Sequence, residues 1–151
     1  MWNKNIPVPI DAKMNPENII RSDLSFPNVN KKRYIKALDE WADPDIVLKA
    51  LKAESMIRSD TYFPHIDKTH YRNALNKWEN PLLVLRKLQA EDIIKNDWSF
   101  DNMNKTSYRD ALEKGEDPII VLNRLQKAYS ALLEASESIR KIAQKLSTRR
   151  I

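Results

Sequence analysis

The chain has 151 residues, no cysteine and a single glycine, and its formal net charge at pH 7 is +5. Without cysteine, disulfides and thiolate metal sites are excluded. Glycine is far below its usual share of about 7%, which argues against tight hairpins and phosphate-binding loops. No apolar run approaches the ~18 residues that a membrane-spanning helix needs. We therefore expect an all-α protein of the cytoplasm that does not bind membranes.

The first 15 residues stand apart from the rest of the chain. Apolar residues alternate with other types around Pro7 and Pro9, and proline restricts both itself and its predecessor to extended backbone. Residues 1–15 are therefore predicted to form an extended N-terminal arm. Two roles stay open for this arm: covering the first repeat, or docking on another chain.

Residues 16–127 are dominated by a 37-residue unit that is written three times, over Glu17–Ala53, Glu54–Ala90 and Glu91–Lys127. Twelve positions hold the same residue in all three copies, including a glutamate, a lysine, a tyrosine and a proline. A fixed period of this length is typical of repeat architectures, in which each unit buries its apolar face against its neighbours. We predict three tandem helix-pair repeats, arranged as a short α-solenoid-like stack or a compact bundle.

The first helix of each repeat is predicted to begin after a good N-cap residue. These residues are Asn30, Asp67 and Asn104. Apolar residues then recur at helical spacing and end on Trp41 in the first repeat and Trp78 in the second, so we expect both indoles to be buried against the following repeat. Gly115 takes this position in the third repeat. It is predicted either to mark the end of the stack or to cap its helix.

The second helix of each repeat is predicted to begin at a proline that follows Asp or Asn, because proline fits the first helical position. These prolines are Pro44, Pro81 and Pro118. The connector between helices carries an apolar pair in every copy, and we expect it to pin the loop to the core. The pairs are Phe26 with Val29, Phe63 with Ile66, and Phe100 with Met103.

The last helix is predicted to run from Pro118 to about residue 147, or roughly 45 Å at 1.5 Å per residue. Residues 128–151 thus continue this helix and carry a basic tail. Apolar residues recur along it in 3-4 alternation, which is typical of a coiled-coil seam. The candidate seam consists of Leu125, Ala128, Leu132, Ala135, Ile139, Ile142 and Leu146. Three occupants stay open: a second copy of this chain, which we expect first, the chain's own repeats, or a foreign helix.

Catalytic and metal-binding patterns are not evident. His65 and His70 have no counterparts in the other repeats, and a structural metal site needs about four ligands. The glutamate that opens each repeat is predicted to pair with the basic residue four positions later. We expect no catalytic residue, no metal and no cofactor, and hence no enzyme.

Nucleic-acid binding is the alternative function, because basic residues recur at the repeat spacing and cluster in the tail. The candidate contacts are Lys31, Lys32, Arg33, Lys68, Arg72, Lys105, Arg109, Arg140, Lys141, Lys145, Arg149 and Arg150. Acidic residues cancel most of this charge within the repeats, and the third repeat is net acidic. The sequence therefore favours a non-catalytic protein-interaction or assembly module, a scaffold or adaptor with a repeat surface and a C-terminal oligomerisation helix.

Overall fold

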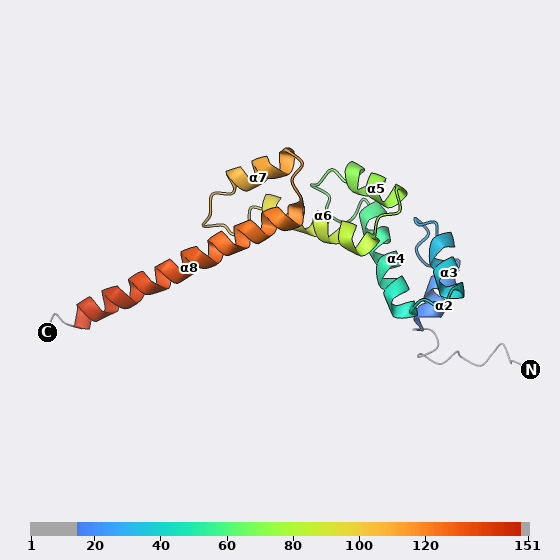
Figure 1. Ribbon diagram of the computed structural model, residues 1–151, viewed down its shortest axis with the longest axis horizontal. Helices are drawn as coiled ribbons and strands as arrows, with labels where there is room; N and C mark the ends of the chain where they lie inside the picture. The colour runs from blue at the N-terminus through green and yellow to red at the C-terminus, as the bar shows by residue number, and fades with distance from the viewer. Residues whose placement is uncertain (1–14, 149–151) are drawn as a thin grey trace, which may run out of the picture. The chain divides into compact units, whose positions relative to one another are not determined.

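The computed structural model describes residues 15–148, and within that range all regular secondary structure is α-helical (Figure 1). The helices are α2 (Pro16–Arg21), α3 (Lys32–Asp39), α4 (Pro44–Arg58), α5 (Thr69–Asn76), α6 (Pro81–Lys95), α7 (Thr106–Glu113) and α8 (Pro118–Thr148). The all-α prediction is confirmed. The predicted N-terminal arm, apart from Asn15, lies outside the described residues. The chain divides into two compact units, one up to Leu88 and one from Gln89 onward.

The second helix of every repeat begins at its proline, as predicted. In α4 the carboxylate of Asp43 accepts the backbone N–H of Asp45 at 2.9 Å. The side chains of Asn80 and Asp117 accept the equivalent N–H groups of α6 and α8 at 3.0 and 2.9 Å. Each side chain satisfies one of the N–H groups that a helix start leaves unpaired.

The first helix of every repeat begins one residue later than predicted. The N-cap position of α3, α5 and α7 is held by a lysine whose side chain makes no capping bond. The preceding Asn30, Asp67 and Asn104 still accept the N–H two residues ahead, at 3.0–3.1 Å. Such a bond forms a turn just before the helix, and this turn shifts the helix start.

The unit up to Leu88 contains two apolar clusters, one for each of its repeats. Ile20 and Leu51 are fully buried in the first cluster, and Ile57 and Leu88 in the second. The connector residues Val29 and Ile66 are buried in the same clusters, with Phe26 and Phe63 packed against them. The predicted pinning of the connectors is confirmed there.

The unit from Gln89 onward is built around α7 and the start of α8. Ile94, Val121 and Leu125 are fully buried in its cluster, and Phe100 and Met103 pack against it. The ring of Phe100 meets the ring of Tyr129 edge to face, with centroids 5.0 Å apart. Tyr129 is therefore close to the last point at which α8 contacts this core.

The burial predicted for the two tryptophans is wrong, because Trp41 is 95% and Trp78 is 71% exposed. Each occupies the left-handed region just after its helix, with φ of 69° and 68°. The N–H of Ala42 donates to the carbonyl of Ala37 at 3.0 Å, and the N–H of Trp41 to that of Leu38 at 3.0 Å. These two bonds define a Schellman helix end, so the helical periodicity stops before the indole.

Gly115 forms the same helix end in the third repeat, with φ of 87°. The N–H of Glu116 donates to the carbonyl of Ala111 at 3.1 Å, and that of Gly115 to Leu112 at 3.0 Å. Glycine adopts this backbone conformation without strain. The prediction of a C-terminal cap is therefore confirmed for Gly115.

Candidate functional site

The first candidate site is the exposed stripe of α8. The helix continues well past α7 in Figure 1, and every residue from 130 to 148 is exposed. The four large residues Leu132, Ile139, Ile142 and Leu146 are between 42% and 67% exposed. Together with Ala135 they form what we call the α8 stripe. The predicted seam is therefore divided, because Leu125 belongs to the core of the third repeat and Ala128 lies at the junction.

The α8 stripe is bordered by small residues, and the charges lie on the rest of the helix. On a helical wheel the positions beside the stripe are mostly alanine and serine, namely Ala131, Ser136, Ser138 and Ala143. The outer face carries Glu134, Glu137, Arg140 and Lys141. Arg140 donates to Glu137 at 2.8 Å. A second helix could therefore approach the stripe closely without burying an unpaired charge.

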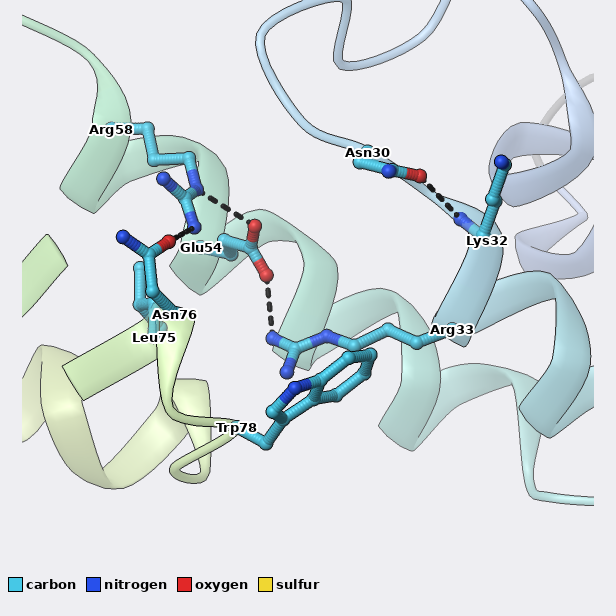
Figure 2. Close-up of a pocket in the computed structure, with 8 residues that line it drawn as sticks. All are labelled: Asn30, Lys32, Arg33, Glu54, Arg58, Leu75, Asn76 and Trp78. Carbon is cyan, nitrogen blue, oxygen red and sulfur yellow. Dashed lines mark hydrogen bonds and ion pairs between the residues drawn. The ribbon is translucent and has the colours of Figure 1, made fainter. Parts of the chain in front are cut away.

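The second candidate site is a pocket of about 430 Å3 in the unit up to Leu88. Figure 2 shows the exposed indole of Trp78 at its rim beside the guanidinium of Arg33. The pocket is lined by Asn30, Lys32, Arg33, Glu54, Arg58, Leu75, Asn76 and Trp78.

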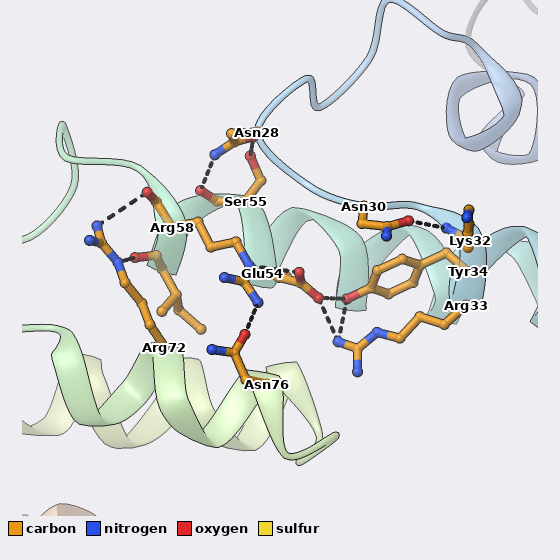
Figure 3. Close-up of polar contacts among 11 residues, drawn as sticks. Asn28, Asn30, Lys32, Arg33, Tyr34, Glu54, Ser55, Arg58, Arg72 and Asn76 are labelled. Atoms are coloured by element: carbon orange, nitrogen blue, oxygen red, sulfur yellow. Dashed lines mark hydrogen bonds and ion pairs between the residues drawn. The ribbon is translucent and has the colours of Figure 1, made fainter.

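Glu54 is the central polar group of this pocket and is only 4% exposed. Its carboxylate accepts from the hydroxyl of Tyr34 at 2.5 Å, from Arg33 at 2.5 Å and from Arg58 at 2.8 Å (Figure 3). Burial alone would raise the pKa of Glu54, but the bonds from Tyr34 and Arg58 and the charge of Arg33 outweigh it and lower that pKa. Burial and the bond to Glu54 raise the pKa of Tyr34. Glu54 thus stays ionised and neutralises the cations around it.

Two other contacts in the pocket hold α5, one from the first repeat and one from within the second. The guanidinium carbon of Arg33 lies 5.3 Å from the ring centroid of Trp78, a cation–π distance. Arg58 also donates to the side chain of Asn76 at 2.9 Å. The end of α5 is therefore held to α3 and α4 by polar contacts, and we interpret the pocket as a repeat junction whose cations already have partners.

The repeated lysines fasten the connector loops to the preceding helix. Lys68 is buried, and its ammonium group donates to the carbonyls of Ser59 and Tyr62, both at 2.5 Å. Lys105 is buried likewise and donates to the carbonyls of Asn96 and Ser99. Burial lowers the pKa of both lysines.

In the first repeat Lys31 makes the corresponding bonds, to the carbonyl of Ser22 and to the hydroxyl of Ser25. The recurrence of this lysine is therefore explained by the carbonyls that each ammonium group satisfies.

Arg72 and Arg109 also act within the fold. Arg72 donates to the carbonyl of Ile57 at 3.2 Å and to the carboxylate of Asp60 at 3.0 Å. Arg109 makes the equivalent bonds to Ile94 at 3.4 Å and Asp97 at 3.0 Å. Both arginines thereby cap the carbonyl end of the preceding helix.

The candidate nucleic-acid contacts divide into exposed cations and cations that the fold uses. Lys32, Arg140, Lys141 and Lys145 are exposed, whereas the cations named above are used by the fold. Arg149 and Arg150 lie outside the described residues.

The predicted pairing of the opening glutamates is confirmed in all three repeats. Glu17 pairs with Arg21 at 3.2 Å, Glu54 with Arg58 at 2.8 Å and Glu91 with Lys95 at 3.2 Å. The sequence analysis missed the contact between Tyr34 and Glu54, which lie 20 residues apart. Both positions hold the same residue in all three repeats, which is a signal that they matter. That signal does not show that the two side chains meet, because their contact is tertiary.

Over residues 15–148, no group of three or more potential metal ligands comes together. In the same range, no helix is both long and apolar enough to cross a bilayer. Comparison of the chain with protein-family models, with curated proteins and with solved structures finds no match. Function is therefore inferred from the two candidate sites.

Proposed function

We propose that this chain is a non-catalytic assembly module of the cytoplasm. It carries three helix-pair repeats, and it self-associates through the α8 stripe. The observation that supports this most is the exposure of Leu132, Ile139, Ile142 and Leu146 along a helix that extends beyond its own core. A helix of 31 residues is about twice as long as α4 or α6, which have 15 each. The core of the third repeat needs only the first part of that length.

The energy available from the stripe sets the expected affinity. Full burial of a leucine or isoleucine contributes about 1.5–3 kcal/mol, so four residues at the observed exposure contribute about 3–7 kcal/mol per helix. Two helices would gain about 7–14 kcal/mol from the buried apolar surface, whereas association costs an estimated 4–15 kcal/mol. The difference between this gain and this cost is small, so the complex should be reversible and should depend on protein concentration.

Nucleic-acid binding is the second candidate function. Of the candidate contacts within the described residues, Lys32, Arg140, Lys141 and Lys145 are exposed. Binding confined to these groups should be weak and should fall steeply with salt. Tight binding that survives removal of residues 140–151 would favour this function over assembly.

The test of self-association is a pair of charge substitutions in the stripe, Leu132→Asp with Ile139→Asp. The matched control is Leu133→Asp with Gln144→Asp, which introduces the same charge on the outer face of the same helix. We expect light scattering to give a dimer or larger assembly for the wild type and the control, and a folded monomer for the stripe variant. A monomeric wild type whose stripe variant unfolds would instead show that the stripe packs on its own repeats.

A further inference from the structure

The α8 stripe and the alanine that precedes it are uneven in size, and this limits how two copies can pair. Ala128 and Ala135 alternate with Leu132, Ile139 and the larger residues that follow. In a parallel, in-register pair each residue would face its own copy. Alanine would then meet alanine and leucine would meet leucine. Successive layers of facing residues would then alternate between underpacked and overpacked. Protein cores are packed at an even density, so this arrangement is unfavourable.

We propose that α8 pairs with a second copy of itself in the antiparallel direction, with Ala135 facing Ile139 of the second copy. This inference rests on the proposed function and specifies its partner. In this register Ala128 faces Leu146 of the second copy and Leu132 faces Ile142. The small residues are therefore each matched by a large one. The register is also self-consistent under a two-fold axis, because exchanging the copies returns the same pairs.

The flanking residues fit this arrangement. Ser136 and Ser138 would each lie beside their own copies near the two-fold axis, where small side chains permit close approach. A parallel pair would instead bring Lys145, which borders the stripe, level with its own copy and would align the two helix dipoles.

The antiparallel direction has a structural consequence for assembly. It places the third repeats of the two chains at opposite ends of the paired helices. The two copies of Leu125, where α8 leaves its core, would be separated by 24 residues of helix rise, or about 36 Å. Such a dimer presents two copies of the third repeat at a fixed spacing, which is the basis of bivalent binding.

Cysteine cross-linking tests the direction, and the chain offers a clean background because it has no cysteine of its own. Chains with Ala128→Cys are mixed with chains with Leu146→Cys, oxidised mildly and analysed by mass spectrometry. We expect the mixed disulfide dimer to dominate. Ala128→Cys alone should stay largely uncross-linked, because its two copies would be about 27 Å apart along the helix axis. The control is Leu133→Cys mixed with Lys141→Cys, which lie level with each other but on the outer face.

The outcomes separate this inference from the proposed function. Cross-linking of Ala128→Cys with itself, at the expense of the mixed dimer, would show a parallel pair and overturn the antiparallel assignment. A dimer by light scattering with no cross-link above the outer-face control would also overturn the register, while leaving self-association in place. A monomer at every concentration would overturn both.

Discussion

Replacing Glu54 with alanine should destabilise the protein much more than the same change at Glu17, the equivalent position of the first repeat. Glu54 accepts three hydrogen bonds and is almost fully buried. Glu17 makes an exposed ion pair with Arg21. Exposed pairs of this kind contribute at most about 1 kcal/mol, so the comparison isolates the effect of burial.

The expected loss of stability for Glu54→Ala follows from the interactions that each partner of Glu54 loses. Removing one member of a buried ion pair costs about 3–5 kcal/mol of stability when the remaining charge is not solvated by water. The side chains of Arg33 and Arg58 are 21% and 26% exposed, so water recovers part of that cost. The hydroxyl of Tyr34 is buried and loses its acceptor, which costs about 1–3 kcal/mol. We expect a loss of about 2–4 kcal/mol for Glu54→Ala and under about 0.5 kcal/mol for Glu17→Ala.

Urea unfolding followed by far-ultraviolet circular dichroism measures both losses. The difference between wild type and Glu54→Ala should also depend on pH. Because the pKa of Glu54 is lowered in the folded protein, its stabilisation is present above the unfolded-state pKa. It is lost as the pH falls below about 4.5, the usual value. Equal losses for the two variants, or a loss that grows in acid, would refute the account of the junction.

The remaining predictions use the same unfolding assay. Trp41→Gly should stabilise the protein by about 1 kcal/mol, because it removes a non-glycine residue from the left-handed backbone region. Trp78→Gly should stabilise the protein less, because it also loses the contact with Arg33. Equal stabilisation by the two variants would exclude a role for that contact. Lys68→Met should cost about 1–3 kcal/mol, because it leaves buried carbonyls without a donor, while the exposed control Lys32→Met should change stability by less than about 0.5 kcal/mol. If Lys68→Met left the stability unchanged, the lysine would not be what fastens the connector loop.

The starts of the second helices and the apolar core were predictable because their signals are local. Asp43 before Pro44 determines a helix start through two adjacent residues, and an Asp or Asn before proline recurs in each repeat. The position of Trp41 was mispredicted because the apolar period was extended past Asp39, where α3 ends. The glycine at the same position of the third repeat was the signal that this position needs a left-handed backbone.

The candidate sites were predictable only in part. The stripe of α8 follows from a heptad pattern, and the structure shows that its side chains are exposed and that Leu125 belongs to the core instead. The repeated lysines have a structural reason to recur, and sequence spacing does not reveal it, because it does not show that the ammonium of Lys68 reaches the carbonyl of Ser59. The network around Glu54 depends on contacts between helices and was not visible at all.

The central claim is that α8 brings two copies of this chain together. Sedimentation equilibrium of the wild-type protein, at concentrations from about 1 µM to about 1 mM, tests it most directly, because these concentrations match net binding free energies of about −8 to −4 kcal/mol. We predict that the average mass rises with concentration towards twice the mass of one chain. A mass equal to one chain over the whole range would contradict the claim.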